Sequence, residues 1–262
     1  MALEQWGEAL REIQRRIQQE HPNLFTPGYT SGKSDEPECA ICGDRGFFVR
    51  DGYNIACPCH QAKSEAERAK RIIERSGLAD SLEQCTLESF DHAQPFQQNM
   101  FDAATRFLAS DKSWMYMGGQ PGCGKTHICT AVCGELLKRD VPVKYMCWTE
   151  ESRKIKAGTM DAELLDELLE PIKCAGVLYI DDLFKGAPRR DGRLTPSDAD
   201  VKLAFEIFNY RYVANLRTII SCEWDIRELL HIDQAIFSRV YERCRACMVY
   251  VAPDMDKNWR LK

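Results

Sequence analysis

Gly119-Gln-Pro-Gly-Cys-Gly-Lys-Thr126 is the stretch of sequence that decides the fold, because it matches the pattern G-x-x-x-x-G-K-[ST]. The residues Ser113–Met117 before it predict a short strand, and helical periodicity from Thr126 to Lys138 follows it. Glycines allow such a loop to curl with its N–H groups pointing inward, and the start of the helix adds a positive dipole end. The stretch therefore predicts a loop that cradles the phosphates of a nucleoside triphosphate, here ATP with Mg²⁺.

Two residues of this loop have specific expected roles. Lys125 is expected to reach the β- and γ-phosphates and to act in catalysis, and Thr126 is expected to bind Mg²⁺. The residues predicted to contact the nucleotide are Gly119, Gln120, Pro121, Gly122, Cys123, Gly124, Lys125, Thr126 and His127.

A pair of carboxylates supplies the second half of the predicted site. Asp181 and Asp182 follow the apolar run Val177-Leu-Tyr-Ile, which predicts a buried strand. Ligands bind at the carboxyl ends of strands in open α/β sheets. We therefore expect Asp181 to hold Mg²⁺ and to contribute to the nucleotide site, and Asp182 to polarise the attacking water.

Strands and helices alternate through the C-terminal two thirds of the chain, which is typical of a parallel sheet covered on both faces. The sequence predicts an α/β fold with three layers, α/β/α, over residues 86–262. Further strands are predicted at Val141–Cys147, Gly176–Ile180, Arg217–Ser221 and Met248–Val251, and further helices at Asp200–Tyr212 and Asp225–Arg243.

Composition narrows the possible environments. The formal net charge is −5, which argues against coating nucleic acid by bulk positive charge. The sequence lacks a long apolar run and a signal peptide, so we expect a cytoplasmic protein without membrane contact. Thirteen cysteines then indicate a reducing compartment, with thiols either buried or bound to metal. Those predicted to be small core residues are Cys85, Cys129, Cys133, Cys147, Cys174, Cys222, Cys244 and Cys247.

A cysteine cluster near the N-terminus has a different pattern. Cys39 and Cys42 form a C-x-x-C pair, and Cys57 and Cys59 form a C-x-C pair that is followed by His60. The fourteen residues between the two pairs read as a hairpin, which would bring the pairs together. Four thiolates, with His60 as an alternative ligand, predict a structural Zn²⁺ site.

The N-terminal third divides into two expected parts. Residues 3–20 carry one apolar stripe at helical spacing, which is either a local core or a partner-binding face. Together with the cysteine cluster they define a helical and zinc-binding module over residues 1–62. Residues 63–85 are rich in charge and are expected to be a linker helix.

These features together resemble the AAA+ replicative helicase loaders of the DnaC/DnaI type, especially those of phages and prophages, within the IstB-like ATP-binding superfamily. The resemblance covers about residues 39–262. It rests on the paired cysteines, Leu87–Phe90, the phosphate loop, the two aspartates, Asn209–Tyr212, Thr218–Ser221, Ile232–Glu242 and Asn258–Arg260.

The resemblance implies roles that the residues alone do not. Arg239 falls at the position of an arginine finger, which would act on ATP held by a neighbouring subunit and would make hydrolysis depend on a homo-oligomer. Arg260 falls at the position of a second phosphate sensor, and the short tail around it implies that the full helical lid is missing. Glu223 stands where the family has a polar amide, so Ser221 is the alternative group to position water, and slow hydrolysis is expected.

The implied function is ATP-dependent loading of a replicative hexameric DNA helicase onto single-stranded DNA. The N-terminal module would bind the helicase. Two groups of basic residues either contact single-stranded DNA, at one of them or both, or form solvated surface. The first is in the predicted insert after the second strand and the second is in the loop after Asp182; they are Arg153, Lys154 and Lys156, with Trp148 for stacking, and Arg189, Arg190 and Arg193. Two alternatives remain open: a transposition helper ATPase of the IstB type, and an ATP-gated helicase adaptor with little hydrolysis.

Overall fold

A computed structural model describes residues 39, 42, 44–50, 53–57, 76–158 and 161–261. The chain forms two compact units, 1–71 and 72–262, which are considered separately. The predicted helix of residues 3–20, the ligand candidates Cys59 and His60, and residues 63–75 of the predicted linker lie outside the described residues.

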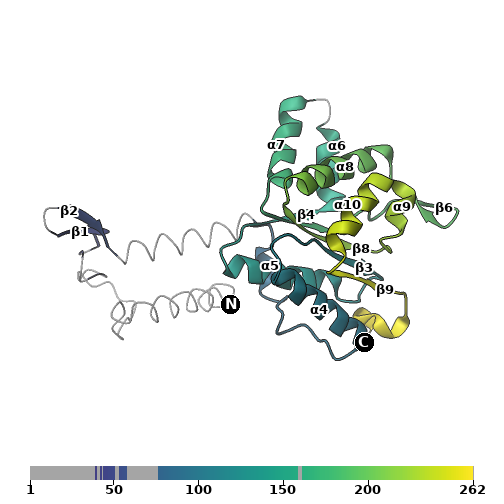
Figure 1. Ribbon diagram of the computed structural model, residues 1–262, viewed down its shortest axis with the longest axis horizontal. Coiled ribbons are helices and arrows are strands. Elements are labelled where there is room, and N and C mark those ends of the chain that lie inside the picture. The colour runs from purple at the N-terminus through teal and green to yellow at the C-terminus, as the bar shows by residue number, and fades with distance from the viewer. Residues whose placement is uncertain are drawn as a thin grey trace. The chain divides into compact units, whose positions relative to one another are not determined.

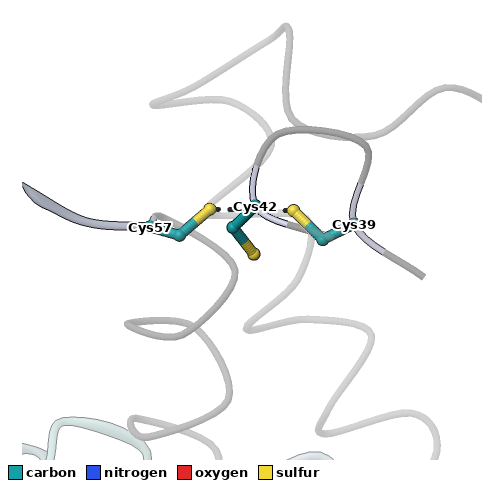
Figure 2. A group of neighbouring side chains, drawn as sticks. All are labelled: Cys39, Cys42 and Cys57. Carbon is teal, nitrogen blue, oxygen red and sulfur yellow. Dashed lines mark hydrogen bonds between the residues drawn. The ribbon is translucent and has the colours of Figure 1, made fainter. Parts of the chain in front are cut away.

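The first unit contains the predicted hairpin. Strands β1 (Phe47–Arg50) and β2 (Tyr53–Ala56) pair antiparallel, with Phe47 opposite Ala56. The hairpin returns Cys57 to the turn that carries Cys39 and Cys42 (Figure 2). The prediction that this segment brings the distant cysteines together is therefore confirmed for three of the four residues.

The second unit is built on one parallel five-stranded sheet (Figure 1). Its strands, in spatial order, are β4 (Val143–Cys147), β5 (Val177–Asp181), β8 (Arg217–Cys222), β3 (Met115–Gly119) and β9 (Met248–Val251). All neighbouring pairs run parallel, which confirms the predicted α/β class. Strand β3 begins two residues later than the predicted Ser113. It ends at Gly119, the first residue of the phosphate loop, so it leads directly into that loop.

Helices cover both faces of this sheet. The first group consists of α3 (Ala79–Leu82), α4 (Pro95–Leu108) and α5 (Lys125–Lys138). The second consists of α6 (Trp148–Ala157), α7 (Ala162–Lys173), α8 (Asp198–Val213), α9 (Glu228–Ile232) and α10 (Gln234–Cys244). A small hairpin, β6 (Arg189–Arg190) with β7 (Arg193–Leu194), follows β5, and two 3₁₀ turns, η1 (Met255–Lys257) and η2 (Trp259–Leu261), follow β9. No helix among the described residues has the length and apolar character needed to cross a lipid bilayer.

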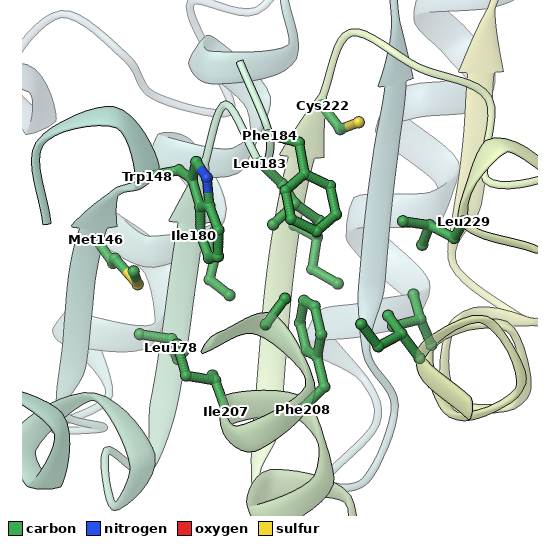
Figure 3. Close-up of a cluster of buried hydrophobic side chains, with 14 of the residues drawn as sticks. Met146, Trp148, Leu178, Ile180, Leu183, Phe184, Ile207, Phe208, Cys222 and Leu229 are labelled. Atoms are coloured by element: carbon green, nitrogen blue, oxygen red, sulfur yellow. The ribbon is translucent and has the colours of Figure 1, made fainter. Parts of the chain in front are cut away.

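Alternation along each strand sends side chains into two separate cores. In β5, Leu178 and Ile180 join the core under α6–α10, where they lie near Ile207 and Phe208 of α8 (Figure 3). Val177 and Tyr179 point the other way, into the core under α4 and α5. The same alternation places Asp181 on the α5 side of the sheet, the side on which the phosphate loop opens.

Two sequence predictions about helices and thiols are wrong. Residues Asp225–Arg243 form two helices rather than one, because Asp233 is extended (φ −158°) and its side chain accepts the Ile236 N–H at 2.8 Å as the cap of α10. Cys174 is exposed where α7 ends, rather than buried in the core. An isolated cysteine beside apolar residues does not reveal which side of a helix end it occupies.

The other predicted core thiols are at least partly covered. Cys129, Cys133, Cys222, Cys244 and Cys247 are buried, whereas Cys85 and Cys147 are half-buried. Burial raises the pKa of the Cys222 thiol to about 12 and raises the pKa of Cys129 and Cys133 as well. These thiols are therefore protonated at neutral pH and serve as packing groups.

Arg211, near the end of α8, is the buried charge that joins three elements of the second unit. Its guanidinium lies among the last residues of α7, the loop after it and the start of β8. It donates to Thr218 Oγ1 at 2.9 Å, to the carbonyls of Ile172, Lys173 and Ala175 at 3.2, 3.0 and 2.8 Å, and to the carbonyl of Arg217. Burial lowers the pKa of Arg211 to about 9, so the group stays charged at neutral pH and its hydrogen bonds are charge-assisted.

Replacing Arg211 by methionine should lower the free energy of unfolding by about 3–5 kcal/mol, because buried carbonyls would lose their donors. Urea unfolding followed by tryptophan fluorescence measures this change. Arg227→Met is the matched control: Arg227 is paired with Asp225 at 2.6 Å, but its side chain is 80% exposed, so its loss should cost under about 1 kcal/mol. Equal effects of the two substitutions would contradict the role given to Arg211.

Candidate nucleotide-binding site

The phosphate loop lies between β3 and α5 in a conformation that requires glycine. Gly119, Gly122 and Gly124 have φ values of 135°, 79° and 95°, in the region that side chains rarely adopt. Gly124 is the residue before α5, and Lys125 begins the helix. The loop therefore has the form that the sequence predicted, with the N-terminus of α5 facing the space that the loop encloses.

At two of these positions neighbouring atoms leave no room for a side chain, which is a second reason for glycine. A Cβ atom on Gly119 would lie 2.4 Å from the Val251 carbonyl oxygen of β9. A Cβ atom on Gly122 would lie 2.0 Å from Oδ1 of Asn258. The loop is thus pressed against the segment that follows β9.

That C-terminal segment, residues 254–260, is held by hydrogen bonds to the loop. The Gln120 side chain donates to the Asp254 carbonyl at 2.8 Å and accepts the Asp254 N–H, and the Trp259 N–H donates to the Gly122 carbonyl at 2.9 Å. The Gln120 side chain therefore ties the phosphate loop to the C-terminal segment. Arg260 is carried to the edge of the cleft in front of the loop.

Lys125 is buried, and its ammonium group lies inside the loop. Nζ donates to the carbonyls of Gly119 at 2.8 Å and Gln120 at 2.9 Å. These carbonyl oxygens satisfy the ammonium group, as phosphate oxygens would in a nucleotide complex. The side chain is thus already positioned by the loop that it serves.

A cleft of about 320 Å³ opens in front of the loop. The phosphate loop and residues 89–97 around the start of α4 line it, together with residues that follow β5 and β8 and with the C-terminal segment. The lining residues are Ser89, Phe90, Asp91, Gln94, Phe96, Gln97, Pro121, Gly122, Cys123, Gly124, Lys125, Thr126, His127, Asp182, Lys185, Glu223, Asp256, Lys257, Trp259 and Arg260. Phe90 and Phe96 give it apolar surface suited to a flat base, and its four cations suit phosphates.

His127 of α5 connects the phosphate-loop side of the cleft to the segment before α4. Its Nε2 lies 3.1 Å from Ser89 Oγ and 3.1 Å from the Thr86 carbonyl oxygen, and its ring meets the Phe90 ring edge to face at 5.4 Å. His127 therefore anchors the segment before α4 to the first turn of α5. The sequence predicted that His127 contacts the nucleotide, and the structure places it among the residues that line the cleft.

Asp181 is a buried carboxylate held by hydroxyl groups from three strands. Tyr179 Oη donates to it at 2.7 Å and Tyr145 Oη at 3.1 Å, and Ser221 Oγ donates as well. Burial and the nearby carboxylate raise the pKa of both tyrosines, so the hydroxyls remain donors at neutral pH. Such a preorganised carboxylate, beside the start of α5, is the kind of ligand that Mg²⁺ binds directly or through water.

Ser221 lies beneath the aspartates rather than among the residues that line the cleft. Its hydroxyl donates to Asp181 and accepts the Asp182 N–H at 3.0 Å. The residue is fully buried. The hydroxyl that was expected to position water is thus engaged in fixing the two carboxylates.

Asp182 and Glu223 both reach the cleft, and one lysine lies between them. Lys185 Nζ lies 2.7 Å from Asp182 Oδ2 and 3.5 Å from Glu223 Oε1. The hydrogen bond to Asp182 raises the pKa of Lys185. The site therefore contains a cation beside Glu223, the residue at which the family resemblance implied an amide.

Arg239 lies outside this cleft, on the α8–α10 side of the sheet. It projects from α10, and its Nη1 donates to the Ala235 carbonyl at 2.9 Å. The guanidinium stands 5.4 Å from the Phe205 ring centroid and 5.7 Å from that of Tyr212. None of the residues that line the cleft belongs to α10. Within one chain, Arg239 and the phosphate loop therefore lie on different surfaces.

The first unit holds a separate candidate site for a metal. The sulfur atoms of Cys39, Cys42 and Cys57 all lie within 4.8 Å of one another, and Cys39 Sγ and Cys57 Sγ are 3.6 Å apart (Figure 2). Tetrahedral thiolates at a Zn–S distance of 2.3 Å would be about 3.8 Å apart. The Cys39–Cys57 distance is close to this value, and three of the four predicted ligands therefore lie near enough to one another to share a metal ion.

Sequence reasoning missed several residues of the nucleotide site. Tyr179 is two residues before Asp181 on the same strand, so strand periodicity could have placed it on the same face. Tyr145 and Lys185 carry no such signal. Tyr145 reaches Asp181 because Cys147 of β4 pairs with Asp181, and that strand order is a property of the fold.

The glycine loop, the strand that ends in two aspartates and the parallel sheet define a P-loop ATPase domain of the AAA type. The family model described as "ATPase family associated with various cellular activities" matches residues 115–239. Phage-like element PBSX protein XkdC of Bacillus subtilis is 30% identical over 227 residues, which are 82% of each chain. Replicative helicase loader DnaC of Escherichia coli K12 is 25% identical over 165 residues, 60% of this chain and 63% of that one.

A solved structure extends the comparison to the fold. The crystal structure of DnaI superposes with a TM-score of 0.53 at 24% identity, covering 68% of this chain and 92% of that one. The chain belongs to the AAA+ ATPase family that includes the helicase loaders of the DnaC/DnaI type.

Replacing Gly122 by alanine should weaken ATP binding by about tenfold or more, because the new Cβ would collide with Asn258 and displace the C-terminal segment. Titration with a fluorescent ATP analogue measures the dissociation constant. Gly192→Ala is the matched control: its φ of 77° nearly equals that of Gly122, but its Cβ would meet nothing within 4 Å. Unchanged affinity in Gly122→Ala would show that the segment does not shape the cleft.

Proposed function

We propose that the protein is an ATP-dependent loader of a replicative hexameric DNA helicase onto single-stranded DNA. One observation carries this proposal: an AAA-type domain with a cleft at its phosphate loop and a cysteine-bearing hairpin unit occur in the same chain. The relatives named as helicase loaders support it. The two units would divide the work, with the first binding the helicase and the second responding to ATP.

The residues that line the cleft, together with the buried Asp181 next to them, fit ATP with Mg²⁺, and we give them separate tasks. The loop N–H groups and Lys125 would bind the phosphates, and Thr126 and Asp181 would hold Mg²⁺. Magnesium, when bound, would offset the charge of the phosphates. Asp182 would orient the attacking water, and Arg260 would sense the nucleotide from the C-terminal segment. Slow hydrolysis is expected because Glu223 accepts hydrogen bonds but cannot donate them.

The first unit would be a structural zinc module. Cys39, Cys42 and Cys57 would supply three thiolates, with Cys59 or His60 completing the site. A closed site of this kind stabilises a small segment that lacks a core of its own. The hairpin would thereby be held as a rigid surface for the helicase.

DNA contact is best supported at the β6–β7 hairpin. Arg189, Arg190 and Arg193 are exposed there, close in sequence to Asp182. The insert is less suitable than the sequence suggested. Trp148 is buried against Phe184, and Lys154 and Lys156 are paired with Glu151 and Asp200 at 2.8 and 2.6 Å.

The helicase proposal predicts co-purification with a hexameric replicative helicase that is lost when residues 1–71 are deleted. Pull-down of the full chain against a panel of purified hexameric helicases measures it. Cys57→Ser should lower both the zinc content, measured by mass spectrometry, and helicase capture. Cys174→Ser should change neither, because that thiol is exposed and distant in sequence from the cluster.

Retained ATP binding in the shortened chain shows that the second unit still folds. Capture of a transposase but none of the helicases would instead favour the transposition helper. Helicase capture that survives the deletion would contradict the role given to the first unit.

Assembly into a homo-oligomer predicts that Arg239 completes the cleft of a neighbouring copy. Specific ATPase activity should rise with protein concentration and fall roughly a hundredfold or more in Arg239→Ala, because the arginine would offset charge on the transferred phosphoryl group. Arg245→Ala, an exposed arginine at the end of the same helix, is the control. Normal activity in Arg239→Ala would exclude the arginine finger, and normal ATP binding with negligible wild-type hydrolysis would favour the ATP-gated adaptor.

A further inference from the structure

The turn from Asp182 to Gly186 has an unusual backbone. Asp182, Phe184 and Gly186 have φ values of 57°, 57° and 81°. A positive φ is a clear outlier for a bulky residue such as phenylalanine, and such strain persists only where the surroundings impose it. The turn carries Lys185 between two of these residues.

Buried side chains hold the turn in this shape. Leu183 and Phe184 are both buried, and the Phe184 ring meets Trp148 edge to face at 5.2 Å (Figure 3). The Leu183 N–H donates to the Ser221 carbonyl at 3.0 Å, and the Lys185 N–H donates to the Asp182 carbonyl at 2.9 Å. The packing thus fixes a backbone that points Lys185 toward the cleft, although the lysine itself is exposed.

The charges around Lys185 explain why a cation is needed there. Asp182 and Glu223 both line the cleft, and without Lys185 they would present two negative charges to the terminal phosphate of ATP. Lys185 Nζ lies between them, at 2.7 Å from Asp182 and 3.5 Å from Glu223. The lysine offsets this repulsion and remains accessible to a ligand in the cleft, because about half of its side chain is exposed.

We propose that Lys185 contacts the γ-phosphate in addition to Lys125, and that it does so in place of the amide for which Glu223 is substituted. Lys185 is a cation held by two carboxylates. It lies on a strained and well-packed turn that directly follows β5. On ATP binding, Lys185 exchanges Asp182 for the terminal phosphate. Asp182 is then released to orient water, while Glu223 keeps the lysine in the cleft. ADP has no γ-phosphate, so it leaves the Asp182–Lys185 pair intact.

This inference rests on the proposed ATP site, but it does not depend on helicase loading. Titration of the full chain with fluorescent analogues of ATP and of ADP in the presence of Mg²⁺ tests it directly. Lys185→Met should weaken ATP binding about tenfold or more while changing ADP affinity by less than about twofold, because only ATP loses a charge-assisted contact. Lys185→Arg, which retains the charge, should keep most of the preference for ATP.

Lys138→Met is the matched control. Lys138 forms an ion pair with Glu135 that has the same 2.7 Å distance and the same spacing of three residues, but it lies outside the cleft lining. The control should leave both affinities unchanged. Equal urea midpoints for the wild type and the Lys185 variants show that a change in preference is not due to misfolding.

Three outcomes would overturn the inference. They are equal weakening of ATP and ADP binding in Lys185→Met, no change in either, and tighter ATP binding, which would make Lys185 an inhibitory group. Failure of the wild type to bind either nucleotide would instead overturn the ATP site itself. Absence of a helicase partner would leave this test unaffected, so the two proposals fail separately.

Discussion

The buried carboxylate of Asp181 is the feature on which the nucleotide site depends. A buried carboxylate is costly unless hydrogen bonds satisfy it, and here the donors come from β4, β5 and β8. Tyr145, Tyr179 and Ser221 can meet at this point only if those strands are adjacent and in the observed register. The order of the sheet therefore also fixes the position of the carboxylate that we propose as the Mg²⁺ ligand.

A second consequence of this network concerns the neighbouring acid. Ser221 holds both Asp181 and the backbone of Asp182, so the two carboxylates occupy fixed but different environments. Asp181 faces α5 and is buried, whereas Asp182 begins a strained turn and reaches the cleft. Two adjacent residues of one type thereby have different environments, one buried and one accessible from the cleft, which suits the different roles that we propose for them.

The local elements of this fold could be predicted from the sequence because each has a short-range signal. The glycine pattern marked the phosphate loop, apolar runs marked the strands, and the paired cysteines marked the hairpin ends. The break between α9 and α10 at Asp233 was not predicted, because a capping aspartate and an aspartate within a helix look alike in sequence. Tyr145 and Lys185 were missed because strand order and a turn with positive φ bring them to the site.

The segment after β9 is bound to the phosphate loop mainly through its backbone. The Gln120 side chain forms hydrogen bonds with the N–H and carbonyl of Asp254, and the Gly122 carbonyl accepts the Trp259 N–H, whereas Met255 is 80% exposed and Trp259 is 56% exposed. Most substitutions in this segment would keep those backbone contacts. The position of the segment therefore depends on Gln120 and Gly122 of the loop more than on Met255 and Trp259, and the loop itself sets where Arg260 stands at the cleft.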